Sequence, residues 1–406
     1  MTLYLDCNAT TPIDPRVRDE VVRVFTSVYG NAGSPHEYGE AAKDIVSRAR
    51  ESVSQAIGCK RHEIIFTSGA TEANNLAILG AAPSAREMGK MHVVSSRIEH
   101  KAVLEPIQAL GKQGFEVTWV NPQSNGRVDH EEFIAAVRPD TFLASLMHVN
   151  NETGVVQPID AVAEGLLDSE VLLHVDAAQG FTKELEALRH ARIDLVSISG
   201  HKIHGPQGVG TLVARRRQGQ LPPLTPLCFG GGQEFGLRPG TLPVPLIAGL
   251  GLATQLAVSE HAERRDHCQT LRQTVLEWVR GVGGIIHGDP TCTLPHVVNV
   301  SIPGFAADEL IELFRRDLAV SDGAACTTIC TTPSHVLSAM GVTEPQLSGA
   351  IRMSWSHMTD HEELRIKLNR HRRVSRSVVS PEAKKSRSVP EPSLRFPSQV
   401  RFPFQD

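Results

Sequence analysis

The sequence has no two cysteines in a Cys-x-x-Cys spacing, although seven cysteines occur among its 406 residues. An odd number of scattered cysteines argues against a disulfide framework and against a structural zinc site. The start of the chain lacks a basic and apolar leader, and no apolar run approaches the length that spans a membrane. We therefore expect a soluble, cytoplasmic protein that holds no metal and contacts no membrane.

A strong excess of positive charge is also missing, because the formal net charge is −4. The chain as a whole is therefore not an obvious nucleic-acid-binding protein. Residues 370–406 differ, since nine Lys or Arg against three acids give this segment +6 and leave −10 for the rest. Ser, Pro, Arg and Lys replace periodic apolar residues there, which predicts a basic, disordered tail over 371–406. Such a tail could touch DNA or an acidic partner, but we favour a solvated extension.

Short apolar segments alternate with longer helical segments through the first half of the chain. Strands are expected at 63–67, 92–96, 115–120, 142–149, 171–175, 193–199 and 209–213. Helices are expected at 41–57, 71–79, 101–110, 130–137 and 161–167. This alternation predicts an α/β fold, with a mainly parallel seven-stranded sheet covered by helices on both faces. Ligands of such sheets bind at the carboxyl ends of the strands.

The second half begins with a connection rich in Pro and Gly, 218–245, and a long helical region, 246–282. A smaller α+β pattern follows, with strands at 296–302 and 318–321 and helices at 308–315, 333–340 and 359–369. We expect a large domain over 15–245 and a small domain formed by 1–14 together with 246–370.

Lys202 is the first candidate for chemistry. It stands between the apolar run 193–198 and a glycine-rich turn that leads into a second apolar run, 209–213. Partial desolvation in such a setting lowers the pKa of a lysine amine and prepares it to form a Schiff base. Taken alone, a lysine that caps a turn explains the pattern equally well.

Other predicted strand ends carry polar groups that suit a phosphorylated pyridine ring. Asp176 follows the strand 171–175, and a buried carboxylate there must be paired or hydrogen-bonded. It could cap a helix, or it could keep a pyridine nitrogen protonated beside Lys202, so that the ring acts as an electron sink. The turn 68–71 opens a helix whose amides could bind a phosphate, although a capping box without ligand is an alternative.

Two more strand ends bring polar residues to the same edge of the sheet. His100 follows the strand 92–96, and Asn151 follows the strand 142–149. A lone histidine at such a position is more often structural than catalytic. Together with Asp176 and Lys202, however, these residues offer polar groups that converge at one edge of the sheet.

Six short motifs now resemble, in order, those of pyridoxal-phosphate-dependent cysteine desulfurases in the class V aminotransferase group. They are Thr67-Ser68-Gly69-Ala70-Thr71-Glu72, Glu99-His100-Lys101-Ala102-Val103, His148-Val149-Asn150-Asn151-Glu152, His174-Val175-Asp176-Ala177-Ala178-Gln179, Ser199-Gly200-His201-Lys202 and Arg238-Pro239-Gly240-Thr241-Leu242. The resemblance runs from Tyr4 to about Asn369. It implies the fold type I architecture of pyridoxal-phosphate enzymes.

The resemblance also implies how the pyridine ring would be held. Lys202 would bind pyridoxal 5'-phosphate covalently as a Schiff base. Asp176 would pair with the ring nitrogen, and Gln179 would bond the ring hydroxyl. His100 would stack on the ring and help to move protons.

Phosphate and substrate contacts follow from the same resemblance. The cofactor phosphate would be bound by Ala70, Thr71, Ser199, His201 and Thr241. In this family the threonine that matches Thr241 comes from the neighbouring subunit, which implies a homodimer with shared sites. Asn151 and Arg352 would orient the L-cysteine substrate, with the Arg352 guanidinium binding its carboxylate.

The segment that follows Val320 resembles the sulfur-accepting loop of the family, with Cys326 at the persulfide position. A thiolate there would attack the sulfur of cofactor-bound cysteine and leave alanine and a protein persulfide. Asp322 would disfavour the thiolate, so activation would depend on His100 or on the position of the loop. Cys330 could relay sulfur or form a resolving disulfide, but we favour a small buried thiol. The same interpretation applies to Cys7, Cys59, Cys228, Cys268 and Cys292.

The sequence therefore predicts an enzyme that converts L-cysteine to L-alanine and transfers the sulfur to an acceptor protein. A selenocysteine lyase, another class V aminotransferase-type enzyme and a non-catalytic sulfur-trafficking scaffold are the alternatives. The segments 5–12, 29–34 and 233–238 resemble the desulfurase branch that supplies DNA phosphorothioation. The acceptor would then be a DNA-modification enzyme. An iron-sulfur scaffold is the other candidate acceptor, although this sequence lacks the acidic, aromatic terminus that some relatives offer to such a scaffold.

Overall fold

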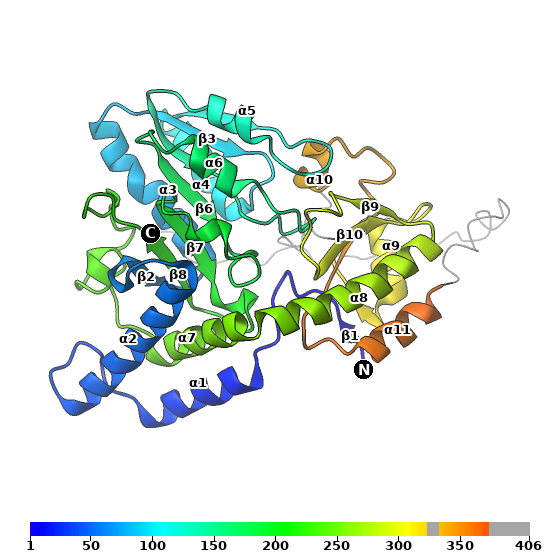
Figure 1. Ribbon diagram of the computed structural model, residues 1–406, viewed down its shortest axis with the longest axis horizontal. Coiled ribbons are helices and arrows are strands. Elements are labelled where there is room, and N and C mark those ends of the chain that lie inside the picture. The colour runs from blue at the N-terminus through cyan, green and yellow to red at the C-terminus, as the bar shows by residue number, and fades with distance from the viewer. Residues whose placement is uncertain (323–332, 373–406) are drawn as a thin grey trace, which may run out of the picture.

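A computed structural model describes residues 1–322 and 333–372 of the chain. Its larger sheet has seven strands in the order β2-β8-β7-β6-β5-β3-β4 (Figure 1). These strands are β2 (Ile64–Thr67), β3 (His92–Ser96), β4 (Glu116–Val120), β5 (Thr141–Ser145), β6 (Leu172–Asp176), β7 (Leu195–Ser199) and β8 (Gly210–Ala214). Strand β8 runs antiparallel to β2 and β7, and the other neighbouring pairs are parallel. The predicted α/β class and mainly parallel sheet are confirmed.

Helices cover both faces of this sheet, because its strands alternate between two apolar cores. Ile64 and Phe66 pack into one core, and Ile65 between them packs into another. Helices α3 and α4 pack together, with α3 against β7 and β8. The helices that accompany the larger sheet are α1 (Pro15–Ser27), α2 (Glu37–Ile57), α3 (Ala70–Glu87), α4 (Lys101–Lys112), α5 (His130–Ala135), α6 (Ile159–Gly165) and α7 (Val244–Ser259). Burial of every residue in β5 and β7 is typical of a parallel sheet covered on both sides.

A smaller antiparallel sheet, in the order β12-β10-β9, lies beside the first and has its own apolar core. Trp278, Phe314 and Trp355 fill much of that core. Its elements are α8 (His261–Gly281), β9 (Ile285–His287), β10 (Val297–Ser301), α9 (Ala307–Phe314), β12 (Ala350–Ser354) and α11 (His361–Arg370). Helix α10 (His335–Ala339) instead packs Val336 and Leu337 into a core of the larger sheet. The amino-terminal strand β1 (Leu3–Tyr4) pairs with β11 (Leu318–Ala319), so the chain begins in this part of the molecule.

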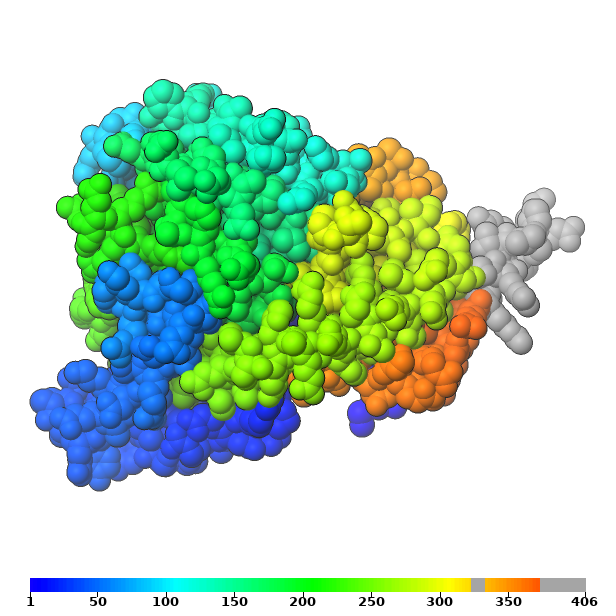
Figure 2. Space-filling view, viewed as in Figure 1, coloured from blue at the N-terminus to red at the C-terminus, as the bar shows by residue number. Residues whose placement is uncertain are grey.

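Helices α7 and α8 run end to end from the larger sheet to the smaller one (Figure 1), and they form a continuous band at the surface in Figure 2. Helix α7 packs on α1 and α2, and it is close to α2 because Gly251 offers no side chain. A Cβ atom at Gly251 would lie 2.7 Å from Cα of Ala49. The predicted helical region 246–282 is thus two helices, separated at Glu260.

Each predicted strand and helix of the larger sheet has a counterpart in the structure, but some ends differ. The expected strand 142–149 ends earlier, at Ser145, and the expected helix 71–79 continues to Glu87. Among the α-helices and strands of the described residues, α1, β1, β9 and β12 were not predicted. The division into domains 15–245 and 1–14 with 246–370 stays a prediction. The predicted tail, 371–406, lies outside the described residues except for its first two.

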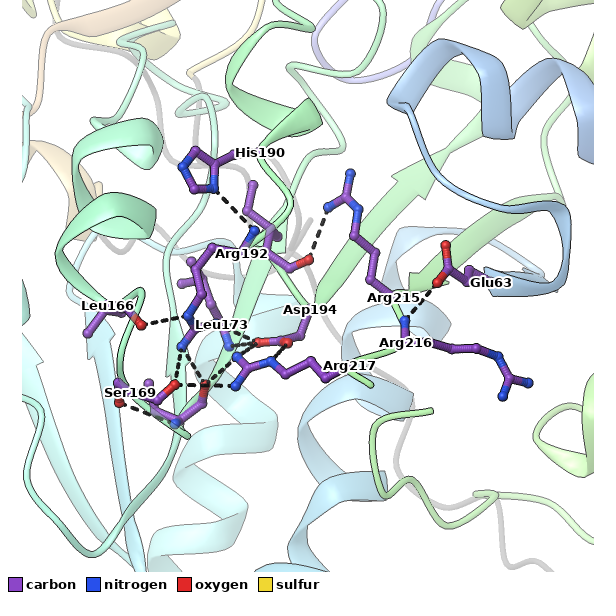
Figure 3. A network of polar contacts seen from close by, with 12 residues as sticks. Glu63, Leu166, Ser169, Leu173, His190, Arg192, Asp194, Arg215, Arg216 and Arg217 are labelled. Atoms are coloured by element: carbon purple, nitrogen blue, oxygen red, sulfur yellow. Dashed lines mark hydrogen bonds and ion pairs between the residues drawn. The ribbon is translucent and has the colours of Figure 1, made fainter. Parts of the chain in front are cut away.

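A polar network closes the amino-terminal ends of β6 and β7 (Figure 3). Asp194 is 1% exposed, and its carboxylate accepts hydrogen bonds from the Leu173 amide at 2.7 Å and from Nη1 of Arg192 at 2.8 Å. Arg217 donates to both of its carboxylate oxygens. The buried charge is therefore paired and hydrogen-bonded, as a buried carboxylate must be. This network lies at the opposite end of β7 from Lys202.

The structure corrects one expectation about the cysteines. Cys7 and Cys268 are buried, and Cys59 and Cys292 are partly buried, but Cys228 is exposed. Cys228 belongs to the connection between β8 and α7, which runs over the surface. Within the described ranges, no helix is both long and apolar enough to cross a membrane.

Candidate active site

The carboxyl ends of β5, β6 and β7 face a cavity of about 860 Å³. Predicted site residues from six separate segments converge there, and most of them follow parallel strands, which bring their carboxyl ends to one edge. Those that line the cavity are Ala70, Thr71, His100, Asn151, Asp176, Gln179, Ser199, His201, Lys202 and Arg352. Thr241 is exposed and does not line it. Cys326 and Cys330 lie outside the described residues.

Lys202 ends the short 3-10 helix η3 (Gly200–Lys202), which follows β7 directly. Its amine donates to the carbonyl oxygens of Asn8 at 2.5 Å and Ala9 at 2.6 Å. Sequence reasoning did not identify these two partners, because a backbone carbonyl leaves no signal in the residue type. The neighbouring His201 has its pKa lowered to about 4 by burial and by the charge of Lys202. At neutral pH this imidazole is therefore uncharged.

Asp176 is the last residue of β6 and is 5% exposed. One carboxylate oxygen accepts from Nδ2 of Asn74 at 2.8 Å, and the other accepts from the Ala178 amide at 2.9 Å. These two bonds fix the plane of the carboxylate at the cavity wall. Gln179 is held in the same way, since its Nε2 donates to the Asn8 carbonyl at 2.9 Å. Its Oε1 is buried and has no hydrogen-bond partner among the described residues.

The turn between β2 and α3 presents free backbone amides to the cavity. Helix α3 begins after Gly69 without a side-chain cap, so the amides of its first turn are open to an anion. The predicted capping box is incomplete, because Glu72 accepts from the Ser68 amide at 2.7 Å but no side chain caps the helix. Gly210 permits this turn to lie against β8, since a Cβ atom there would be 2.6 Å from Cα of Gly69.

His100 is the N-cap of α4, and its Nδ1 accepts from the Ala102 amide at 3.1 Å. The adjacent Glu99 is fully buried and accepts from Oγ of Ser96 at 2.6 Å and from the Met147 amide at 2.8 Å. Burial, with a smaller contribution from Asp176, raises the pKa of Glu99 to about 8. Glu99 was not predicted to have a role. An acid immediately after an apolar strand was the available signal.

Arg352 extends from β12 to the opposite wall of the cavity, and its side chain is 3% exposed. Its Nη2 lies 2.7 Å from Oδ1 of Asp6, and its Nη1 donates to the Asn151 carbonyl at 3.0 Å. The two predicted substrate residues are thus joined directly. Asp6 was missed by the sequence reasoning, since only its place in the amino-terminal motif drew attention to it.

These groups fit a phosphorylated pyridine cofactor. An amine, a fixed carboxylate and uncapped helix amides line one cavity, and the unpartnered Oε1 of Gln179 can accept from a ring hydroxyl. Within residues 1–322 and 333–372, no group of three or more His, Cys, Asp or Glu side chains is placed to hold a metal ion.

Comparison with known proteins agrees with the geometry. Residues 3–366 match the family described as aminotransferase class-V. The chain is 42% identical over 368 residues to the cysteine desulfurase IscS of Vibrio cholerae serotype O1, covering 90% of each chain. A solved NifS-like protein is 37% identical with a TM-score of 0.85, over 92% of this chain and 99% of that one. DndA from Streptomyces lividans is 46% identical with a TM-score of 0.77, over 86% of this chain and 98% of that one.

The chain therefore belongs to the class V aminotransferase family and, within it, to the cysteine desulfurases, which are pyridoxal-phosphate-dependent enzymes. The predicted family, fold type and cofactor are confirmed. A further solved structure, SspA in complex with cysteine, is 36% identical over 87% of this chain and 98% of that one, with a TM-score of 0.75.

Proposed function

We propose that this enzyme converts L-cysteine to L-alanine and transfers the sulfur through Cys326 to an acceptor protein. The observation that carries the proposal is that Lys202, which follows β7 of the larger sheet, and Arg352, in β12 of the smaller sheet, line the same cavity. A guanidinium that binds an amino-acid carboxylate would direct the α-amino group of that amino acid toward the lysine. The cysteine in the solved complex of the SspA relative supports the same substrate class.

Pyridoxal phosphate, when bound, supplies an electron sink for negative charge at the α-carbon of the substrate. Lys202 would hold the cofactor covalently and, once released from it, would exchange a proton at its amine. Asp176 would pair with the ring nitrogen, since Asn74 and Ala178 already fix its carboxylate. Gln179 would accept from the ring hydroxyl through Oε1, and His100 would move protons at the edge of the cavity.

The amides of Ala70 and Thr71 would bind the cofactor phosphate at the start of α3, and Ser199 and His201 would complete the site. Because the His201 imidazole is uncharged at neutral pH, it acts as a hydrogen-bonding group there. Thr241 is exposed on its own chain, which supports a homodimer in which it reaches the phosphate of the neighbouring subunit.

Substrate binding depends on Asn151 and Arg352, with Arg352 oriented by Asp6. The Cys326 thiolate then attacks the substrate sulfur. A sulfur–sulfur bond forms and the carbon–sulfur bond breaks, with its electron pair remaining on the carbon, which takes a proton to become the alanine methyl group. Asp322 and Pro333, on either side of the segment that carries Cys326, both line the cavity. Their position supports this assignment.

Spectroscopy and sulfide release test the proposal together. The purified enzyme should be yellow, and Lys202→Ala should lose that colour. Wild type should release sulfide from L-cysteine in the presence of a thiol reductant, and Cys326→Ala should not. Equal sulfide release by Cys326→Ala would rule out the persulfide step, and Cys330→Ala separates the two cysteines of this segment. Turnover of selenocysteine without cysteine turnover would favour a selenocysteine lyase.

The acceptor is proposed to be a DNA-modification enzyme, because the DndA relative shares 46% identity, or an iron-sulfur scaffold of the kind that an IscS relative would serve. A free acceptor thiol requires a reducing compartment, which supports the cytoplasm. Cross-linking the persulfide form of the enzyme to each purified candidate tests this choice. The true acceptor should take up labelled sulfur, and Cys326→Ala should abolish the transfer.

A further inference from the structure

A second, smaller cavity of about 80 Å³ shares Lys202 with the substrate cavity. It is lined in part by the start of α8, the segment before β10 and the residues after β12. Lys202 lines both cavities, whereas Lys183 lines only the smaller one. No Asp or Glu is among the described residues that line it, although four Lys or Arg side chains and four histidines do.

Lys183 is the cation that defines this cavity. Its amine lies 3.4 Å from Nε2 of His296, and among the described residues no carboxylate lies within 4.0 Å of it. Burial lowers the pKa of Lys183 to about 8, so the amine is mostly protonated at pH 7. Lys183 is partly buried, and a charge in such a position without a counter-charge is costly, which makes an anionic partner favourable at this place.

The neighbouring side chains do not supply that negative charge. Burial raises the thiol pKa of Cys7 to about 11 and that of Cys268 to about 12, so both stay neutral at pH 7. Burial lowers the pKa of His204 to about 3 and that of His357 to about 4, so neither imidazole is charged. These four groups contribute a polar wall without compensating Lys183.

The two arginines of the wall already have acidic partners. Arg264 lies 2.8 Å from Glu260 and 3.6 Å from Asp14. Arg265 lies 3.5 Å from Glu184, and 48% of its side chain is exposed, so the cavity borders solvent at this residue. Among Lys183, Arg264 and Arg265, only Lys183 therefore has no acidic partner in the described residues. Lys202, the fourth cation of the wall, donates to the backbone carbonyls of Asn8 and Ala9.

We propose that this cavity is a binding site for one small inorganic anion, such as sulfate or phosphate, with Lys183 as its counter-charge. The cavity is far smaller than the substrate cavity, which favours a small ligand over a nucleotide or a peptide. The amine of Lys183 has three donors, of which one is directed to His296. The site is distinct from the phosphate turn at Gly69, which lines only the larger cavity.

The cavity is also connected to the catalytic lysine. Cys7 lines it, and the next residue, Asn8, provides a carbonyl that accepts a hydrogen bond from the Lys202 amine. An anion bound beside Cys7 would therefore lie next to Asn8, the residue whose carbonyl oxygen accepts the hydrogen bond from Lys202.

Bromide-soaked crystals of the cofactor-loaded enzyme test the site directly, since bromide is located by its anomalous scattering. An anomalous peak is expected within hydrogen-bonding distance of the Lys183 amine. It should vanish in Lys183→Met and persist in Lys90→Met, a lysine outside the cavity that pairs with Glu170. A wild-type cavity without bromide, or a peak of equal height in Lys183→Met, would overturn the proposal.

Calorimetric titration with sulfate extends the test to solution, again with the cofactor-loaded enzyme so that the phosphate turn is filled. The Kd for sulfate should rise at least tenfold in Lys183→Met and stay within about threefold of wild type in Lys183→Arg. The arginine variant keeps the charge and provides the comparison if the methionine variant does not fold. An unchanged Kd in Lys183→Met, or no sulfate binding by wild type, would contradict an anion site.

Discussion

Asp6 and Arg352 form an ion pair of 2.7 Å that joins the amino-terminal segment to β12 across 346 positions of the sequence. On its other side, the guanidinium donates to the Asn151 carbonyl. Arg352 is thus fixed before any substrate arrives, and a preoriented guanidinium loses less freedom on binding a carboxylate.

Replacing Asp6 should impair substrate binding more than cofactor binding. In Asp6→Asn we expect KM for L-cysteine to rise roughly tenfold, about 1.4 kcal/mol, because Arg352 loses the anion that orients it. Steady-state kinetics measure this change. Asp19→Asn removes an exposed ion pair with Arg18 and serves as the control. A KM equal to wild type in Asp6→Asn would show that Arg352 needs no orienting partner.

Glu99 should make the folded enzyme less stable as the pH rises. Burial raises its pKa to about 8, above that of the unfolded chain, so the folded state holds the extra proton between about pH 4 and pH 8. The stability associated with that proton is fully present at low pH and is lost as the pH rises through 8. Glu99→Gln imitates the protonated side chain and should escape this loss.

Thermal unfolding of both proteins from pH 5 to pH 9 measures the effect. The variant should gain in Tm relative to wild type as the pH increases. Parallel curves for the two proteins would mean that Glu99 does not titrate in this range.

Gly210 should control the affinity for pyridoxal phosphate. A methyl group in Gly210→Ala would meet Cα of Gly69 at 2.6 Å and the Ile198 carbonyl oxygen at 2.4 Å, so the phosphate turn must move. We expect cofactor affinity to fall at least tenfold, measured by absorbance titration. Gly281→Ala is the matched control, since its new Cβ atom would meet nothing within 4 Å. Equal affinity in the two variants would contradict the assignment of the turn.

Asp194 should matter for stability and not for catalysis. Asp194→Ala leaves Arg192, whose side chain is 4% exposed, without its carboxylate. Loss of one partner from a buried pair costs about 3–5 kcal/mol, so the urea midpoint should fall clearly. Glu362→Gln, which removes a surface pair with Arg365, should change stability by no more than about 1 kcal/mol. A similar midpoint for both variants would contradict the structural role of the network.

The sequence predicted most of the larger sheet, because strands that are buried on both faces leave continuous apolar runs. It missed α1, an amphipathic helix of 13 residues in which only Val17 and Val24 are buried. It also missed β12, where Arg352 interrupts the apolar residues. That arginine is buried because Asp6 pairs with it, and such a partner, 346 positions away, is invisible in a local window.

The candidate site was also predicted only in part. Side chains that belong to the motifs, such as Asp176 and Lys202, were predicted and line one cavity. The carbonyls of Asn8 and Ala9, and the buried state of Glu99, depend on how distant segments pack. Cys228 was expected to be buried and is exposed, because residue type alone does not show whether a connection crosses the surface.

The two ends of strand β7 have different roles, one in stability and the other next to the candidate active site. The Asp194 network secures one end, and Lys202 follows the other, about 17 Å away for five residues of strand. Directed evolution for heat tolerance can therefore sample substitutions around Ser169, Arg192 and Arg217 while leaving the reacting amine untouched. Libraries aimed at new amino-acid substrates can vary residues at the carboxyl end of β7, because the Asp194 network stabilises the other end of the strand.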